Sequence, residues 1–193
     1  MNHMQPTSYE NQTFEKIIYT GTASNGKEYH ECSFIRCDLS SSDFCNNRFV
    51  DCIFEDCNLS MVKLGGSTLN NVIFKNSKLM GVDFRVCDDF LFQVEFENCV
   101  LDYSSFMGKK MPKTLFSATS LKEVNFTQAK LSGAIFKEAD LTSAIFNETE
   151  LHSANFVTAY NYSIDPELNN VKKAAFSTDG LHGLLTKHNL KIV

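Results

Sequence analysis

The stretch from residue 114 to residue 156 reads TLFSATSLKEVNFTQAKLSGAIFKEADLTSAIFNETELHSANF, and it repeats every five residues. A large apolar residue, which we call the centre, occupies each fifth position from Phe116 to Phe156. A helix would need apolar spacings of three and four, and a strand would need strict alternation. A period of five fits neither, and it predicts a solenoid in which each unit forms one short side of a coil.

The same spacing runs toward the N-terminus, interrupted by a slip of two residues between Phe84 and Leu91. The residue two positions before each centre is usually small, so we expect two inward positions per unit. Four units per coil predict a twenty-residue period that stays in phase if the extra residues bulge outward. Two of the resulting columns are Phe14, Phe34, Phe54, Phe74, Phe96, Phe116, Phe136 and Phe156, and, opposite them, Phe44, Leu64, Phe84, Phe106, Phe126 and Phe146.

Units such as KLSGAIF (130–136) and EADLTSAIF (138–146) resemble those of pentapeptide-repeat proteins, and the resemblance covers roughly residues 29–176. It implies an all-β fold, the right-handed quadrilateral β-helix of a pentapeptide-repeat solenoid, with centre and small residue inward. On this basis we expect an N-terminal cap segment at 1–28, the β-helix at 29–176 with a bulge near 85–92, and a C-terminal helix and tail at 177–193.

The composition argues against the common kinds of catalytic and metal site. The chain has 193 residues, a formal net charge of −5, five dispersed histidines and seven cysteines without a CxxC pair. An odd cysteine count and no signal-like N-terminus favour reduced thiols, most of them in the core, in a cytoplasmic protein. No run of apolar residues is long enough to span a bilayer. We therefore expect no enzymatic activity, no cofactor and no metal.

The first departure from the repeat is RVCDDFLFQVEF at 85–96, which contains the slip. If Leu91 and Val94 face inward, Phe90 and Phe92 face outward, and both are candidate partner-binding residues because exposed aromatics mark contact surfaces. The alternative is that the two rings fold over the local backbone and seal the bulge.

The second departure, SSFMGKKMPKTLF at 104–116, places Lys109 where a small residue is expected. Together with Lys110 and Lys113 it forms a second candidate partner-binding set. The alternative is an irregular, solvated turn.

The third departure is the tail. Ser177 or Thr178 is suited to cap a short α-helix with Leu181, Leu184 and Leu185 on one face. This helix would close the last coil, since solenoids need end caps. It would equally serve as a dimerisation element if the leucines meet those of a second copy.

Two functions remain open. One is a dimeric scaffold that binds another protein and has no assigned role. The other comes from a resemblance of CNLSMVKL (57–64) and SSFMGKKMPKTLFSATSLKEVNF (104–126) to Qnr-type quinolone-resistance proteins. That resemblance implies a DNA-mimicking homodimer that modulates DNA gyrase or topoisomerase IV and protects against quinolones. Neither reading requires direct contact with nucleic acid or membrane.

Overall fold

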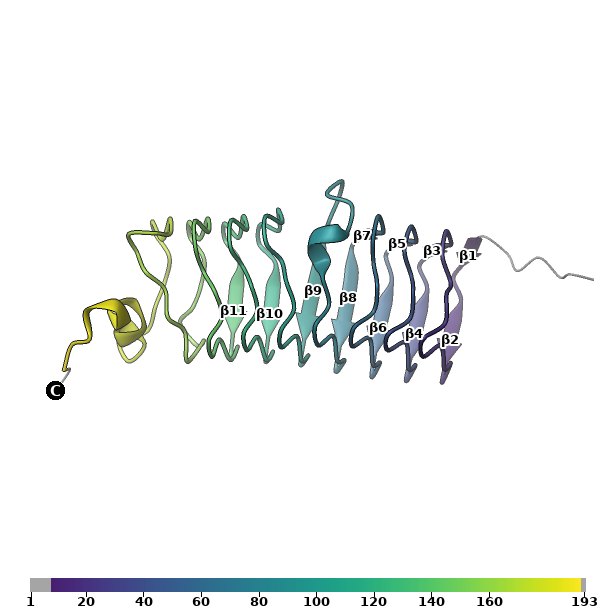
Figure 1. Cartoon of the computed structure of the whole chain (residues 1–193), viewed down its shortest axis with the longest axis horizontal. Coiled ribbons are helices and arrows are strands. Elements are labelled where there is room, and N and C mark those ends of the chain that lie inside the picture. Colours follow the sequence, from purple (N-terminus) through teal and green to yellow (C-terminus); the bar gives the residue numbers. More distant parts are fainter. Residues whose placement is uncertain (1–7, 192–193) are drawn as a thin grey trace, which may run out of the picture.

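A computed structural model describes residues 8–191. These residues form a right-handed β-helix, a rod in which successive coils stack along one axis (Figure 1). Strands are short because every side of a coil contributes only a few residues before the chain turns. The strands are β1 (Ser8–Glu10), β2 (Thr13–Glu15), β3 (Glu28–His30), β4 (Ser33–Ile35), β5 (Arg48–Val50), β6 (Ile53–Glu55), β7 (Thr68–Asn70), β8 (Val72–Lys75), β9 (Val94–Glu97), β10 (Leu115–Ser117) and β11 (Ile135–Lys137).

All strand pairs are parallel and belong to two sheets on adjacent sides of the rod. One sheet has the order β1-β3-β5-β7, and the other has the order β11-β10-β9-β8-β6-β4-β2. Phe34 pairs with Phe14 and with Phe54, which confirms the twenty-residue period. Across the slip, Phe74 pairs with Phe96, so the columns keep their alignment as predicted.

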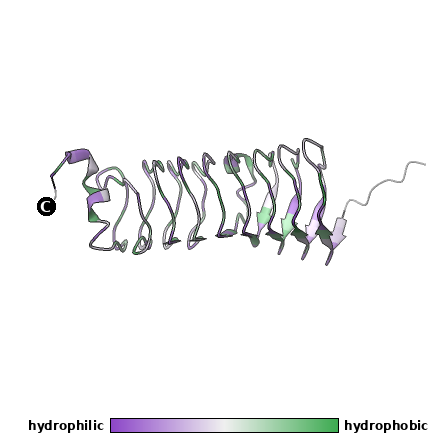
Figure 2. Ribbon diagram, turned by 90° about the horizontal axis from the view of Figure 1, so that it is seen from below, coloured by the Kyte–Doolittle hydropathy of each residue, from purple (hydrophilic) through white to green (hydrophobic). Residues whose placement is uncertain are grey.

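The core consists of the stacked centres. Phe34 and Phe54 are stacked, with ring planes 6° apart and ring centroids 4.5 Å apart. The opposite column meets this one edge to face, as in Phe106 and Phe116, whose centroids lie 6.1 Å apart at 79°. Both geometries are favoured by the ring quadrupole and add about 0.5–1.5 kcal/mol per pair to simple burial. In Figure 2, hydrophobic and hydrophilic residues alternate along the coils, as inward and outward positions require.

Most corners of the coils are made by a left-handed residue two positions after the centre. Arg36 has φ 55° and Asp51 has φ 54°, a conformation that costs an L-residue roughly 1–2 kcal/mol. The backbone N–H groups of these left-handed residues also donate hydrogen bonds to the next coil, and this ladder offsets the cost. Arg36 N donates to Glu55 O at 2.9 Å, and Asp51 N donates to Asn70 O at 3.0 Å.

The small residues fill the corners and add hydrogen bonds between coils. Cys99 Sγ donates to Phe74 O in the preceding coil and to Glu97 O, both at 3.3 Å. Ser77, one coil earlier, makes the same pair of bonds through its hydroxyl. Among the seven free cysteines only Cys45 is partly exposed, which confirms that most of them are core residues.

The β-helix begins earlier than expected. β1 and β2 pair with β3 and β4 in the regular register, so residues 8–28 form a coil rather than a separate cap. Residues 1–7 of the expected cap segment lie outside the described residues. The five-residue repeat is less regular at 8–28 because this coil lies at the open end of the rod, where Tyr9 and Phe14 are only half-buried.

The C-terminal α-helix is absent from the described residues, so this prediction is wrong. The chain forms two 3₁₀ turns instead, η2 (Leu181–Leu184) and η3 (Thr186–His188). Gly183 lies beneath the backbone and ring of Tyr162, so closely that a Cβ would collide with both. Its carbonyl accepts a hydrogen bond from Ile164 N at 2.9 Å. This contact ties the segment to the last coil, and a helix so short is marginal by itself.

Burial of the thiols predicts a loss of stability at alkaline pH. Burial raises the pKa of the Cys99 thiol from 9.0 to about 11, so the folded chain keeps a proton that the unfolded chain releases. This contribution is complete below pH 9 and is lost as the pH rises toward 11. We expect urea unfolding at pH 10 to give about 1 kcal/mol less stability from this thiol than at pH 7.

Cys99→Ser is the matched variant, because Ser77 and Thr119 already make these bonds in the adjoining coils. It should fold normally and show a smaller difference between pH 7 and pH 10. An identical pH dependence in the two proteins would contradict the assignment.

Candidate interaction site around the inserted loop

The inserted residues form a loop that rises above the tops of the coils between β8 and β9 (Figure 1). The loop starts with a 3₁₀ turn, η1 (Phe84–Val86), capped by Asp83, whose Oδ1 accepts from Arg85 N at 3.0 Å. The Arg85 guanidinium bonds to the same carboxyl group and lowers its pKa. The four-stranded sheet ends at β7, beside this loop.

The structure reverses the predicted orientation of two loop residues. Leu91 was expected to face inward, yet 52% of it is exposed, whereas Phe92 was expected outward and is only 7% exposed. Leu91 has φ 57°, so a left-handed turn falls on the residue that was expected to be a centre. Phe92, the next residue, enters the core and contacts Phe84 edge to face. Phe92 therefore seals the bulge.

Phe90 is at the exposed part of the loop, with 70% of its surface accessible. Its backbone N–H donates to Asp88 Oδ1 at 2.9 Å, a local turn that fixes the backbone beneath the ring. Asp88 N in turn donates to Ser67 O of the preceding coil at 2.9 Å. The loop thus presents an aromatic ring on an ordered backbone.

Lys109 is not on a solvated turn, contrary to expectation. It is 1% exposed, and its ammonium donates to Cys87 O and Asp89 Oδ1, each at 2.6 Å. The ammonium also lies 4.8 Å from the centroid of the Phe92 ring. The bulge supplies both a carboxylate and a ring at this corner, so a long cationic side chain fits where other coils hold a small one. Lys109 and Phe92 therefore support the loop from within and are not available to a partner.

Lys110 and Lys113 are exposed and border the loop. Lys113 lines a shallow hollow of about 350 Å³ between the loop and the turn at Pro112. Leu91 lines the other side of the same hollow. Within residues 8–191 neither lysine forms an ion pair. The structure thus brings the two departures at 85–96 and 104–116 into one surface.

A neighbouring apolar surface was not found by sequence reasoning. Met61 and Tyr103 occupy left-handed corners, and Gly81 occupies the corner between them. The Met61 side chain lies over Gly81, where a Cβ would collide with its sulfur. The sequence signal was present, because large apolar residues at corner positions are unusual in this chain. Met61 and Val86 line one hollow beside Gly81, and Met80, Tyr103 and Met107 are further exposed apolar residues of these coils.

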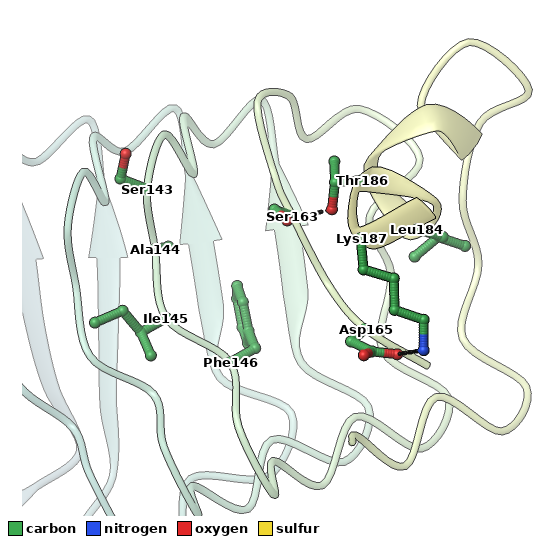
Figure 3. Close-up of a pocket in the computed structure, with 9 residues that line it drawn as sticks. All are labelled: Ser143, Ala144, Ile145, Phe146, Ser163, Asp165, Leu184, Thr186 and Lys187. Atoms are coloured by element: carbon green, nitrogen blue, oxygen red, sulfur yellow. Dashed lines mark hydrogen bonds and ion pairs between the residues drawn. The ribbon is translucent and has the colours of Figure 1, made fainter. Parts of the chain in front are cut away.

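The C-terminal turns leave a second hollow, of about 490 Å³, against the last coils (Figure 3). Lys187 spans it and pairs with Asp165 at 2.9 Å, which lowers the pKa of that carboxyl group. Ser163 and Thr186 hydrogen-bond across it at 2.6 Å. These polar groups satisfy one another, so the contacts close the end of the rod.

The three predicted tail leucines do not share one environment. Leu184 packs against the core, whereas Leu181 and Leu185 are exposed. The Tyr162 hydroxyl beneath these turns is buried and has no hydrogen-bond partner among the described residues.

The described residues offer no grouping of three or more His, Cys, Asp or Glu side chains suited to a metal ion. None of the helices described at 8–191 has the length and apolar character needed to cross a membrane.

Comparisons with known proteins agree with this geometry. A model of the pentapeptide repeat region matches residues 27–106 and 78–156. A search of the curated proteins gave no match. One similar solved structure is trypsin-treated QnrB1, a plasmid-mediated fluoroquinolone resistance protein. It is 15% identical to this chain with a TM-score of 0.57, and the match covers 98% of this chain and 100% of QnrB1.

HetL, a pentapeptide repeat protein involved in heterocyst differentiation regulation from the cyanobacterium Nostoc sp. strain PCC 7120, is 17% identical with a TM-score of 0.46. The match covers 89% of this chain and 92% of HetL. The match to QnrB1 shows the fold alone, and neither match assigns a role. The stacked coils, the twenty-residue register and the match over residues 27–156 together show that this chain belongs to the pentapeptide repeat family.

Proposed function

We propose that this chain is a non-enzymatic interaction protein that binds another protein through the inserted loop and the surfaces beside it. The observation that carries the proposal is Phe90, which is 70% exposed on a loop whose backbone is held by hydrogen bonds. An aromatic ring held in this way offers a large contact area at a small cost in conformational entropy. Such rings are frequent among residues that dominate binding energy.

The surroundings of Phe90 support the same conclusion. Several large apolar residues are exposed in the coils next to the insertion, and exposed apolar surface of this kind is a feature of interaction sites. Lys110 and Lys113 add positive charge at one side, which favours a partner with carboxylates at the rim of the contact. The exposed apolar residues between residues 61 and 107 are Met61, Met80, Val86, Phe90, Leu91, Tyr103 and Met107.

Photocrosslinking tests the binding surface. Benzoylphenylalanine at position 90 should give a discrete crosslinked adduct in extract of the source cells, identifiable by mass spectrometry. Position 18 is the control, because Ile18 is 77% exposed but lies in the first described coil, at the N-terminal end of the rod. The adduct should be competed away by excess unlabelled protein and much less by Phe90→Ala. Equal labelling from positions 18 and 90 would contradict the proposal.

We further propose that two copies associate through their C-terminal ends. Leu181 and Leu185 are exposed on the 3₁₀ turns, and Leu168 and Leu190 are exposed nearby. A two-fold contact would bury the same leucines of both copies. Removing such side chains from water stabilises association by about 25 cal/mol per Å².

Static light scattering checks this association. The protein should elute with twice the monomer mass, and the double variant Leu181→Glu, Leu185→Glu should elute as a monomer, since it would place charges in an apolar contact. Ile18→Glu, which changes an exposed residue far from the tail, should remain dimeric. A monomeric wild-type protein would refute the dimer.

Modulation of DNA gyrase, the alternative implied by the Qnr-type resemblance, needs a continuous series of unpaired acidic groups to imitate phosphates. In the middle coils of this rod, some of the carboxylates pair with lysines of adjacent coils, which interrupts a series of negative charges. Lys75 lies 3.4 Å from Glu97, and Lys130 lies 3.4 Å from Glu150. Lys110 adds positive charge in the same region. We therefore propose the scaffold role in preference to DNA mimicry.

A supercoiling assay separates the two roles. Purified protein in large molar excess should neither inhibit gyrase or topoisomerase IV nor restore activity in the presence of a fluoroquinolone. The reason is that the paired carboxylates offer little net attraction to a basic DNA-binding groove. Dose-dependent inhibition or protection by the wild-type protein would overturn this expectation.

A further inference from the structure

Lys109 is the charged member of a column of otherwise uncharged inward residues. One coil earlier the position is Cys87, and one coil later it is Ala129. A buried ammonium is costly unless it is paired and hydrogen-bonded. Its presence at this corner therefore calls for a structural reason.

The contacts of the ammonium supply that reason. It bonds to Cys87 O and Asp89 Oδ1 in the first half of the loop, and it faces the Phe92 ring in the second half. One side chain thus joins both ends of the inserted segment to the next coil. The Asp89 side chain is itself 70% exposed, so the loop supplies this carboxylate from the rim of the core.

The hydrogen bond from the Lys109 ammonium to Cys87 O takes the place of a backbone bond of the ladder between coils. The equivalent carbonyl one coil earlier, Ser67 O, accepts from Asp88 N at 2.9 Å. One coil later, Lys109 O accepts from Lys130 N at 2.8 Å. At Cys87 the bonded donor is the Lys109 ammonium. The side chain thus supplies a hydrogen bond where the insertion disturbs the stacking of the coils.

We infer that Lys109 is a positioning residue that fixes the inserted loop and so holds Phe90 in its exposed position. This inference deepens the proposed function and rests on it for the role of Phe90. It gives the two departures from the repeat, at 85–96 and 104–116, one common role. The insertion creates the protruding ring, and the lysine 22 residues after Cys87 makes the loop rigid.

The inference implies that insertion and lysine are matched. Deleting Asp89 and Phe90 restores the five-residue spacing, because Leu91 then follows the centre Phe84 by five residues. In that shortened chain Lys109 has lost its carboxylate, and a small residue such as the Ala129 of the next coil should suit the corner better. In the full chain, the same change removes the anchor.

A double-mutant cycle measured by urea unfolding tests this match. Lys109→Ala should lower the urea midpoint of the full chain and raise that of the chain lacking residues 89–90, a reversal of sign. Lys110→Ala is the control and should leave both midpoints nearly unchanged, since its side chain is exposed. A shift of the same sign in both backgrounds would show that Lys109 contributes only general packing and would overturn the inference.

Loop rigidity can be followed directly, because the chain contains no tryptophan. Phe90→Trp introduces a single fluorophore at the loop, whose anisotropy decay should follow the tumbling of the whole rod. Adding Lys109→Met, which keeps the apolar stem, should introduce a fast local component. It should also increase hydrogen exchange at residues 88–92 by at least about tenfold, as expected for loss of hydrogen bonds to a charged group.

Lys110→Met in the same reporter should change neither signal. Unchanged anisotropy and exchange in the Lys109→Met protein would refute the positioning role, and neither readout needs a partner. Failure of the proposed function would appear separately, as absence of the specific crosslink from position 90 in the protein that retains Lys109. A crosslink yield unaffected by Lys109→Met, in a folded protein with a loosened loop, would overturn the link between rigidity and binding.

Discussion

The parallel hydrogen-bond ladder between coils is the constraint on which the rest of this structure depends. It requires each coil to place equivalent residues above one another, as in the bond from Arg36 N to Glu55 O and its counterparts along the rod. Once this register is kept, the centres must stack, the small residues must fill the corners, and the corner residues must adopt left-handed φ. The left-handed conformation of ordinary residues such as Asp51 is tolerated because the ladder and the stacked rings outweigh it.

The same constraint explains how the fold absorbs two extra residues. A shift of register would misalign every later column, so the added length must leave the rod at one place. Phe74 and Phe96 remain paired across the insertion, and the disturbance stays within a single coil. At the disturbed corner, Lys109 supplies the hydrogen bond to Cys87 O, and Phe92 fills the core. Repeat proteins are suited to this solution because each coil contacts only its neighbours.

The period of the sequence was sufficient to predict a solenoid, its columns and the place of the bulge, because these depend on repeated spacing, whereas the right-handed β-helix was implied by the family resemblance. It also placed Phe90 outward. It failed at Leu91 and Phe92, since one left-handed residue exchanges inside and outside and no periodic signal marks it. The role of Lys109 depends on a carboxylate twenty residues away that only the folded loop brings near. The tail was mistaken for an α-helix because leucine spacing does not reveal the contact between Gly183 and Tyr162.

A rod of stacked coils has little capacity to change shape around a ligand, since moving one coil would break ladder bonds on both of its faces. Recognition must therefore come from features that are already in place when the partner arrives. Phe90 meets this requirement because Asp88 holds its backbone and Lys109 holds the loop from inside. A preorganised contact avoids the entropy of ordering a loop on binding. For this reason we expect affinity to depend on how well the loop is anchored as well as on the exposed ring.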